Sequence, residues 1–392
     1  MDQMHKSDQI VIIGAGQGGL QAAASLRQEG YEGRIVLIGE EIAAPYQRPP
    51  LSKAYLKTGD ASRLALRPDS FYETNGIELH LGLRVEAIDR AAQRVRARSQ
   101  DIPYDHLILA TGTRTMRPPI PGLTRARDLR TLSDALALRK ALPKAERVGV
   151  IGGGFIGLEF AAVARELGYE VTVAEAGPRL MGRAVSPVMS DRFAAKHREM
   201  GVEVLLADPV SAGTESGFAL ASGREVAADF ILLAAGVVPN AELASEAGLP
   251  VQNGIVVDSR LVTADPAISA LGDCASFPDP NSDQHVRLES VQAATDHARL
   301  IAKRIAKGDD SPYRAVPWFW SDQADWKLQI AGLAAPTDAC EALPDGTVLR
   351  LDGDHVTAVE TVNAAKTHMK ARKLMGQGER LRREDFLPLA TQ

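Results

Sequence analysis

The chain has 392 residues, of which 45% are hydrophobic and 24% charged, and its formal net charge at pH 7 is -5. This length predicts two or three domains, and the composition is that of a globular protein, not of a disordered, collagen-like or coiled-coil chain. The mild acidity argues against nucleic-acid binding, which usually requires a basic excess. The first apolar run, residues 10–13, is too short for a signal peptide or a membrane span, so we expect a cytoplasmic protein with no membrane segment.

The first informative segment is an apolar strand that leads into a glycine-rich turn. Residues 10–13 read IVII, and residues 20–28 after the turn have a helical pattern. Such glycines allow a tight turn, close approach of the backbone to a pyrophosphate, and packing of the helix on the strand. The glycines of this turn are Gly14, Gly16, Gly18 and Gly19.

A second apolar strand, residues 34–38, completes this first unit. It is followed by Glu40, which lies 21 residues after Gly19. A carboxylate at this spacing is expected to bind a ribose.

The same pattern returns after residue 146. A strand at residues 147–151 leads into Gly152, Gly154 and Gly157, and a later strand ends at Glu175. Two complete strand-turn-helix-acid units 138 residues apart are far more specific than one, so the chain is predicted to bind two dinucleotides.

Glu175 also bears on the choice of nucleotide at the second turn. A carboxylate there accepts hydrogen bonds from ribose hydroxyls and repels a 2'-phosphate, which favours NADH over NADPH. Arg179 and Arg183 follow shortly and could weaken this preference.

Three further apolar strands end in small residues. One ends at Thr111 and Gly112, one at Gly236, and one at Gly272 and Asp273. Each is consistent with an ordinary strand end or turn, but Thr111, Gly112, Gly236 and Gly272 are also candidate cofactor-binding residues. The alternative for Asp273 is a carboxylate that holds a ribityl hydroxyl.

The two cysteines, Cys274 and Cys340, lie 66 positions apart, and the chain has no Cys-x-x-Cys pair. The spacing therefore predicts no bound iron-sulfur cluster, no structural zinc and no other metal site.

Together these residues resemble the flavoprotein disulfide-reductase-like superfamily. Within it, the chain is similar to the FAD-dependent NADH:ferredoxin reductases of bacterial cytochrome P450 and ring-hydroxylating oxygenase systems, of the putidaredoxin reductase and biphenyl dioxygenase reductase type. The most specific element is YQRPPLSKAYL at residues 46–56, supported by ESVQAA at 289–294 and PWFWSDQ at 317–323. The resemblance covers nearly the whole chain.

The resemblance implies that the first turn binds FAD and the second binds NADH. The glycines of the first turn would meet the FAD pyrophosphate. The residues implied to contact the rest of FAD are Glu40 at the adenosine ribose, Arg48 at the adenine or phosphate region, Val85 through its backbone near the adenine, Arg130 at a phosphate, Asp273 at the ribityl chain, and Val291 and Gln292 through backbone N–H groups at the flavin O2 edge. A helix N-terminus at that edge would stabilise negative charge on reduced flavin.

The resemblance further implies that Lys53 and Glu159 form a pair near the flavin N5. Glu159 would lie on the first turn of the second nucleotide-binding helix and adjust as nicotinamide arrives. The alternative is a solvated lysine and a glutamate that the helix dipole favours.

Relatives that reduce disulfides or peroxides need a redox-active cysteine next to the flavin. In the resemblance, that cysteine would lie within residues 43–53, and this segment has none. Cys274 is interpreted as a buried core residue. What remains is a flavin that accepts a hydride and releases electrons singly, for which a [2Fe-2S] ferredoxin is the implied partner.

The order of motifs predicts an α/β protein with two Rossmann-like dinucleotide-binding domains, as in glutathione reductase, and an α+β C-terminal domain. The predicted boundaries are 1–114 with 243–311 for the discontinuous FAD domain, 115–242 for the NADH domain and 312–392 for the C-terminal domain. The last domain would cover the flavin, with Trp320 as an aromatic between flavin and partner or simply a core residue.

Several functions share these motifs. An NADH oxidase, a rubredoxin reductase, and an NADH-sensing flavoprotein resembling apoptosis-inducing factor are the alternatives. The ferredoxin, the terminal oxygenase and the oligomeric state are not encoded in any motif of the chain.

Overall fold

The computed structural model describes residues 8–280, 282, 284–378 and 380–386. The chain forms two compact units, each assembled from segments that are far apart in the sequence. Unit 1 comprises Met1–Gln47, Ala61–Arg114 and Val237–Ala315, and unit 2 comprises Arg48–Asp60, Thr115–Gly236 and Val316–Gln392. In the described ranges, no helix is long and apolar enough to cross a bilayer.

Unit 1 is built on a five-stranded parallel sheet with the strand order β18-β7-β1-β2-β3. Its central strand pairs in parallel with β2 and β7, and these three strands are almost entirely buried. A strand covered on both faces must be apolar at successive positions, which explains the runs IVII and HLIL. The strands are β1 (Gln9–Ile13), β2 (Arg34–Ile38), β3 (Ile77–His80), β7 (His106–Leu109) and β18 (Ile268–Ala270).

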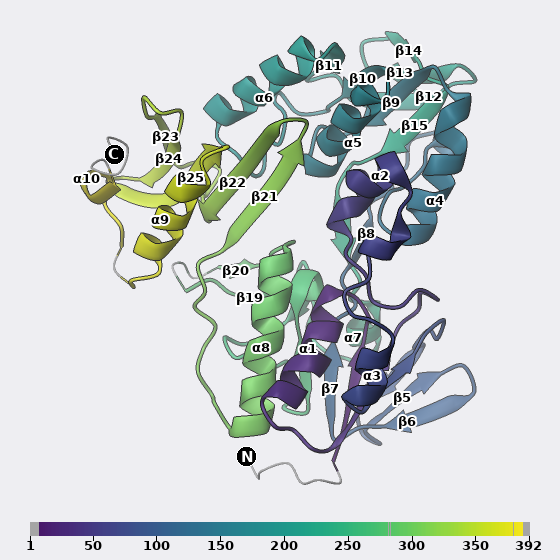
Figure 1. Ribbon diagram of the computed structural model, residues 1–392, viewed down its shortest axis with the longest axis vertical. Helices are drawn as coiled ribbons and strands as arrows, with labels where there is room; N and C mark the ends of the chain where they lie inside the picture. The colour runs from purple at the N-terminus through teal and green to yellow at the C-terminus, as the bar shows by residue number, and fades with distance from the viewer. Residues whose placement is uncertain (1–7, 281, 283, 379, 387–392) are drawn as a thin grey trace. The chain divides into compact units, whose positions relative to one another are not determined.

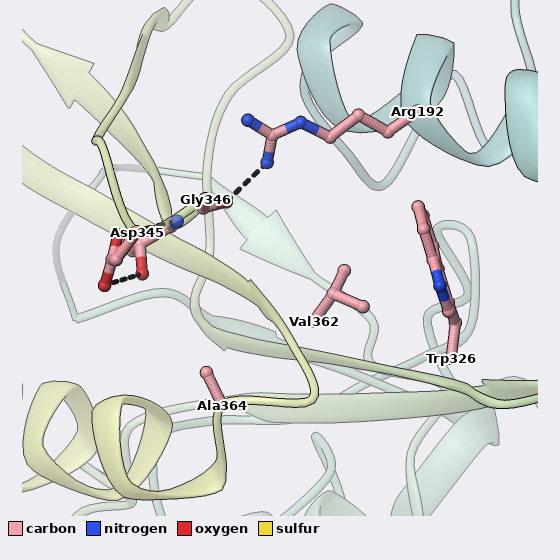
Figure 2. A pocket seen from close by; sticks show the side chains of 7 residues that line it. Arg192, Trp326, Asp345, Gly346, Val362 and Ala364 are labelled. Carbon is pink, nitrogen blue, oxygen red and sulfur yellow. Dashed lines mark hydrogen bonds between the residues drawn. The ribbon is translucent and has the colours of Figure 1, made fainter.

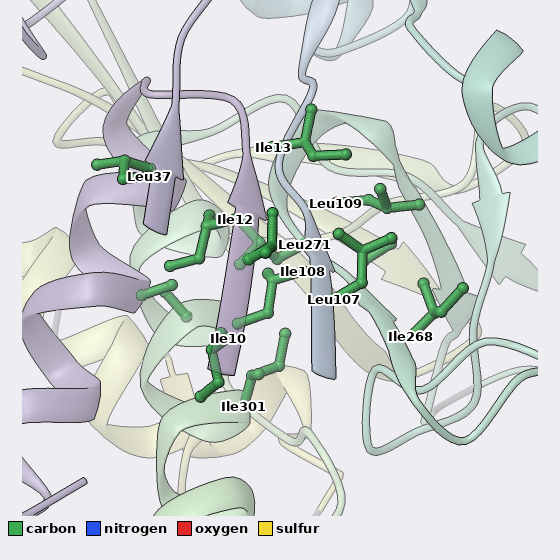
Figure 3. Close-up of a cluster of buried hydrophobic side chains, with 14 of the residues drawn as sticks. Ile10, Ile12, Ile13, Leu37, Leu107, Ile108, Leu109, Ile268, Leu271 and Ile301 are labelled. Carbon is green, nitrogen blue, oxygen red and sulfur yellow. The ribbon is translucent and has the colours of Figure 1, made fainter. Parts of the chain in front are cut away.

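Two helices of unit 1, α1 (Gln17–Gln28) and α8 (Val291–Lys307), lie side by side (Figure 1). The core between helices and sheet contains Ile10, Ile12, Ile108 and Ile301 (Figure 3). All four side chains are fully buried, so this core holds the sheet and the two helices together.

Smaller elements complete unit 1. The antiparallel sheet β4-β5-β6 and the three-stranded sheet β17-β19-β20 are short. These elements are α3 (Ser70–Thr74), α7 (Glu242–Glu246), β4 (Ala87–Asp89), β5 (Arg94–Ala97), β6 (Gln100–Pro103), β16 (Val237–Pro239), β17 (Ile255–Val256), β19 (Ala275–Pro278) and β20 (His285–Val286), with 3-10 turns at Ala61–Arg63 and Gly272–Cys274. Strand β8 (Thr113–Thr115) lies where the chain passes from unit 1 to unit 2.

Unit 2 contains a second parallel sheet, with the order β11-β10-β9-β15. Helix α5 follows β9 in the same way that α1 follows β1. The elements of this part are β9 (Arg147–Ile151), β10 (Glu170–Ala174), β11 (Val202–Leu205), β15 (Phe230–Leu233), α4 (Leu132–Ala141), α5 (Phe155–Glu166) and α6 (Pro187–Glu199), with an antiparallel sheet of β12 (Val210–Gly213), β13 (Gly217–Leu220) and β14 (Glu225–Ala227), and 3-10 turns at Leu123–Arg125 and Leu142–Lys144.

Unit 2 also contains the C-terminal antiparallel sheet, with the order β21-β22-β25-β24-β23, and a helix packed on it. Its strands and the helix packed on them confirm the predicted α+β architecture. The elements are β21 (Trp318–Gln323), β22 (Trp326–Gly332), β23 (Ala339–Ala342), β24 (Val348–Asp352), β25 (His355–Val362), α9 (Ala365–Met375) and α10 (Arg383–Phe386).

The segment Arg48–Asp60 belongs to unit 2 by its contacts. It forms a 3-10 turn, Pro49–Ser52, and helix α2 (Ala54–Thr58), and Arg139 of α4 donates to the carbonyl of Tyr55 at 3.1 Å. Sequence order had assigned this segment to the first nucleotide-binding domain. The division into three domains with the stated boundaries stays a prediction.

Candidate functional site

The first glycine turn of unit 1 has a geometry that only glycines allow. Gly14 has a φ of +110°, and a Cβ there would lie 2.1 Å from the carbonyl oxygen of Ala110 on the neighbouring strand. A Cβ at Gly19 would lie 1.9 Å from the oxygen of Gly14. By contrast, apart from Gly16 and its two chain neighbours, no heavy atom of the described residues lies within 4 Å of a Cβ built at Gly16. The middle glycine therefore opens onto free space.

That free space lies at the start of α1, where Gly16 is the N-cap in extended conformation. The first N–H groups of a helix have no partner inside the helix and point outward. Gly18 contributes differently, because a Cβ there would lie 2.4 Å from Leu271 Cδ1 and block the packing of the helix. The turn fits the pyrophosphate of a dinucleotide.

The second glycine turn, in unit 2, repeats this arrangement. Gly152 has a φ of +109°, and its Cβ would lie 2.3 Å from the carbonyl oxygen of Ala234. A Cβ at Gly157 would lie 2.2 Å from the oxygen of Gly152, and one at Gly154 would have no described heavy atom within 4 Å. This turn also fits a pyrophosphate.

The two predicted ribose-binding acids differ in their surroundings. Glu175 accepts hydrogen bonds from the backbone N–H groups of Gly153 and Gly177 at 2.6 and 2.7 Å. Glu40 lies on the surface and pairs with Arg84 at 2.8 Å. The carboxylate of Glu175 is thus held against its glycine turn, whereas that of Glu40 is held by a solvated side chain.

Arg179, which could have weakened the preference for NADH, has a different role. Its guanidinium donates to the carbonyls of Val185 and Gly182, each at 2.6 Å. Arg183 is exposed, and one of its nitrogens lies 3.2 Å from the position of a Cβ built at Gly236. Gly236 itself has a φ of +108° and lies between β15 and β16.

The strand end at Thr111 and Gly112 is held by Asn240, which we did not predict as a site residue. The Thr111 hydroxyl donates to the Asn240 carbonyl at 2.6 Å, and the Asn240 side-chain amide donates to the Thr111 carbonyl at 2.9 Å. The Asn240 N–H donates to the Gly112 carbonyl. Its position in the run GVVPN after a glycine strand end is the only signal in the sequence.

Asp273 follows Gly272, whose φ is +67° and whose N–H donates to Nδ1 of the buried His297 at 3.2 Å. The Thr113 hydroxyl donates to the Asp273 carboxylate at 3.3 Å. His297 on α8 therefore fixes the turn that carries Asp273.

Val291 and Gln292 are the first two residues of α8. The N-cap hydroxyl of Ser290 accepts from the N–H of Ala293, which is the third residue of the helix. The N–H groups of the first two residues thus lie at the helix N-terminus, where the dipole favours negative charge. The side chain of Gln292 is buried and donates to Asp296 at 2.5 Å.

Lys53 and Glu159 form an ion pair in unit 2, with Nζ to Oε1 at 3.0 Å. Glu159 is only 4% exposed, and the hydroxyls of Ser52 and Ser321 donate to its two oxygens, each at 2.7 Å. Asp322 lies 3.5 Å from Lys53. Burial raises the pKa of the Glu159 carboxyl, and Lys53 and the hydroxyl donors oppose this rise.

Glu159 does not lie on the first turn of its helix, as the resemblance had implied. Helix α5 begins at Phe155 after the N-cap Gly154, so Glu159 is its fifth residue and lies beyond the first turn. Because Glu159 is buried, it is also not an exposed glutamate that the helix dipole alone stabilises. Ser52 and Ser321 were missed as partners, because a serine within a distinctive run has no signal of its own.

Three other predicted residues are placed as follows. Arg48 donates to the backbone carbonyl of Arg130 at 2.6 Å, so these two residues lie together. Val85 is buried in the core of unit 1, and its contact with the adenine stays a prediction. Trp320 is half-buried, and its ring centroid lies 5.5 Å from that of Trp318.

The two cysteines differ in burial. Cys274 is fully buried, its Sγ donates to the Leu271 carbonyl at 3.2 Å, and burial raises the pKa of its thiol. This confirms its interpretation as a core residue. Cys340 is partly exposed on β23, and both thiols are free.

A small pocket of unit 2 lies between α6 and the C-terminal sheet (Figure 2). Its polar groups are already engaged with one another: Arg192 donates to the Gly346 carbonyl, and Asp345 accepts from the Thr347 hydroxyl at 3.0 Å. Trp326, Val362 and Ala364 form its apolar part. The arrangement gives no indication of a binding site for a ligand.

Comparison with known families gives two matches. Residues 8–298 match the family described as pyridine nucleotide-disulphide oxidoreductase, and residues 318–391 match the family described as reductase C-terminal. The first match covers both glycine turns, Lys53, Glu159 and Asp273. The second covers Trp320 and the C-terminal sheet.

Known relatives are similar over almost the entire chain. Rhodocoxin reductase of Rhodococcus erythropolis is 47% identical, over 93% of this chain and 89% of that protein. The ferredoxin reductase for the CYP199A2 system of Rhodopseudomonas palustris superimposes with a TM-score of 0.94 at 41% identity, over 98% of this chain and 100% of the other. The covalent putidaredoxin reductase-putidaredoxin complex matches with a TM-score of 0.91 at 35% identity, over 98% and 99%.

These matches confirm the resemblance inferred from the sequence. The two glycine turns with their acids, the buried ion pair and the full-length similarity agree with one another. The chain therefore belongs to the pyridine nucleotide-disulphide oxidoreductase family, and it is an oxidoreductase that uses FAD and NAD(H) as cofactors.

Proposed function

We propose that this oxidoreductase passes electrons from NADH through FAD to a [2Fe-2S] ferredoxin that supplies a cytochrome P450 or a ring-hydroxylating oxygenase. The observation that carries the proposal is the buried ion pair Lys53–Glu159. It is joined by the lack of any cysteine within residues 43–53, where thiol-dependent relatives need a reactive one. The similarity to rhodocoxin reductase and to the reductase of the CYP199A2 system supports the same acceptor class.

The residues would divide the work between the two nucleotides. In unit 1, Gly16 and the N-terminus of α1 would hold the FAD pyrophosphate, Asp273 the ribityl chain, and the first N–H groups of α8 the flavin O2 edge. Bound FAD would accept two electrons as a hydride and release them one at a time. In unit 2, Gly154 and the N-terminus of α5 would hold the pyrophosphate of NADH.

We infer a preference for NADH over NADPH from the surroundings of Glu175. The two backbone N–H groups that it accepts from keep the carboxylate at the end of β10, where a 2'-phosphate would meet its negative charge. Arg179 is held by backbone carbonyls and so contributes little to binding such a phosphate.

The partner surface is proposed to include helix α9. Lys366, Lys370 and Lys373 are exposed on it, and the Arg372 guanidinium lies 4.4 Å from the ring centroid of Trp318. A basic helix would steer an acidic ferredoxin, and it would do so less effectively at high salt. Arg63 and Arg67 of unit 1 are a second exposed basic pair that could take this role.

The decisive experiment is anaerobic rapid mixing of the FAD-loaded protein with NADH or NADPH, followed by mixing with a [2Fe-2S] ferredoxin. We expect NADH to bleach the flavin quickly and the ferredoxin to be reduced one electron at a time. Reduction with electron delivery to oxygen alone would indicate an NADH oxidase. A slow reduction that ends in a long-lived charge-transfer complex would indicate an NADH sensor.

A charge reversal tests the partner surface separately. We expect Lys370→Glu to reduce the rate of ferredoxin reduction and to weaken its dependence on salt, because one steering charge is inverted. Lys140→Glu on α4 makes the same change on another exposed helix and serves as the control. Equal effects of the two variants would contradict a specific role of α9.

The proposed reaction draws on the NADH pool of the cell. We therefore also infer that the protein works in the cytoplasm. Detection of the protein in cell fractions would test this directly.

A further inference from the structure

The ion pair of Lys53 and Glu159 is the end of a longer chain of buried hydrogen bonds. Nε2 of His197 on α6 lies 2.9 Å from Oε1 of Gln323, whose Nε2 donates to the Ser321 hydroxyl at 3.1 Å. The Ser321 hydroxyl donates to Oε1 of Glu159 at 2.7 Å. All four side chains are at most 4% exposed.

The chain has a direction, because each group in it can play only certain roles. Nε2 of Gln323 also lies 3.6 Å from the sulfur of Met181, which is an acceptor, so this end of the amide is the donor. Its other end, Oε1, then accepts a proton from His197 Nε2. The Ser321 oxygen accepts from Gln323, and its single proton is left for Glu159.

His197 favours this direction over its reverse. Its Nδ1 is buried and has no hydrogen-bond partner among the described residues. In the direction from His197 to Glu159, Nε2 carries the proton and Nδ1 is an acceptor without a donor. In the reverse direction Nδ1 would carry an unpaired, buried N–H, which is the less tolerated of the two.

We propose that His197 and Gln323 are positioning residues that orient the Ser321 hydroxyl toward Glu159 and thereby keep Glu159 ionised against Lys53. The reverse direction would require a protonated Glu159 that donates to Ser321. The role of the ion pair in the reaction rests on the proposed function, but the direction of the hydrogen bonds rests on the geometry alone.

Other charged groups face this chain. Lys53 and the Ser52 hydroxyl contact Glu159 from the turn before α2, and Asp322 of β21 approaches Lys53. Beside His197, Lys196 pairs with Asp325 at 3.0 Å. Burial and Lys196 both lower the pKa of His197, which keeps its ring neutral, and the hydrogen bond to Gln323 opposes this.

The test measures the protonation of Glu159 in the FAD-loaded protein without NADH or ferredoxin. The infrared band of a protonated carboxyl is followed over pH, and its loss in Glu159→Gln assigns it. We expect Ser321→Ala to raise the midpoint by about one pH unit, since one donor to the carboxylate is lost. Ser321→Thr, which retains a hydroxyl, should restore it.

Gln323→Glu tests the direction itself, because a carboxylate accepts from Ser321 and turns its proton away from Glu159. We expect a rise of about one pH unit as well, and little further rise when the same change is made in the Ser321→Ala background. Gln329→Glu on the neighbouring strand β22 is the matched control for added charge. The pH profile of flavin reduction by NADH should move with the infrared midpoint.

Two outcomes would overturn the inference. One is an equal shift of the Glu159 midpoint in Gln323→Glu and Gln329→Glu, which would mean that long-range repulsion between charges causes the shift. The other is full additivity with Ser321→Ala, which would mean that Gln323 does not act through Ser321. Because no acceptor or NADH is needed for the infrared midpoint, failure of the proposed function would leave this result intact.

Discussion

The two glycine turns have nearly the same backbone conformation and the same close approaches, yet the side chains around them differ. Gly14 and Gly152 have φ values of +110° and +109°, and each approaches a carbonyl oxygen of the neighbouring strand. The middle glycine is open in both. The shared geometry follows from a shared task, which is to bring a helix N-terminus to a pyrophosphate.

The differences begin one helix turn later. Gln21 of α1 occupies the position that Glu159 occupies in α5, 138 residues on, and its amide donates to Ser25 of the same helix at 2.9 Å. Glu159 is instead buried against Lys53. The two turns therefore share their backbone geometry, whereas one helix turn later only α5 carries a buried charge that needs a partner.

The largest expected effect comes from breaking either turn. We expect Gly152→Ala to lower the free energy of unfolding by about 4 kcal/mol, since a Cβ would overlap the Ala234 carbonyl and the backbone is in the left-handed region. Gly154→Ala should leave stability almost unchanged but weaken NADH binding. Urea unfolding and NADH titration of the two variants distinguish the effects.

The equivalent substitution in the first glycine turn should affect the binding of FAD. We expect Gly14→Ala to be purified without bound FAD, because its Cβ would meet the Ala110 carbonyl. The flavin absorbance of the purified protein measures this. A Gly14→Ala protein with a full complement of FAD would contradict the assignment of the first turn.

The next effect concerns the buried pair. We expect Lys53→Met to lower the free energy of unfolding by about 3 kcal/mol at pH 8, because a buried carboxylate loses its partner. The pKa of Glu159, already raised by burial, rises further, so its protonated form is favoured in the folded state. The loss should therefore be smaller at pH 6 and grow as the pH rises.

Gln21→Met, at the position of α1 that is equivalent to Glu159 in α5, is the control. It should change the stability little and equally at both pH values, since no buried charge is involved. Urea midpoints of both variants at pH 6 and pH 8 test the contrast. A loss in Lys53→Met that does not depend on pH would show that Glu159 is not the group involved.

A smaller effect is expected at the two acids. We expect Glu175→Gln to raise the KM for NADH about tenfold and to narrow the discrimination against NADPH, since one charged hydrogen-bond acceptor is lost. Glu40→Gln should change FAD retention far less, because Glu40 is exposed and already shared with Arg84. Steady-state kinetics and FAD release measure the two. If Glu40→Gln weakened FAD binding as much as Glu175→Gln weakens NADH binding, the proposed difference between the two acids would be wrong.

The smallest effect is expected at the surface pair itself. We expect Arg84→Met to change the free energy of unfolding by no more than about 0.5 kcal/mol, since water and salt screen an exposed ion pair. Thermal unfolding at low and high salt measures it. A large loss would mean that Glu40 and Arg84 have a structural role beyond their ion pair.

Much of the fold could be predicted because its signals are local. Apolar runs, glycines at fixed spacing and an acid after the next strand all lie within about 30 residues of one another in a βαβ unit. The C-terminal part was predicted only to its α+β class. Asn240 was missed because its partner Thr111 lies 129 positions away.

The sequence by itself determined the two nucleotide turns and the type of each element, because backbone sterics and periodic burial act between near neighbours. Only the tertiary structure decided which side chains surround Glu159. Ser52 and Ser321 lie 107 and 162 positions from it and meet it through the packing of α5 against β21 and the segment before α2. Burial within that packing, and not the identity of Glu159 alone, makes its charge depend on its partners.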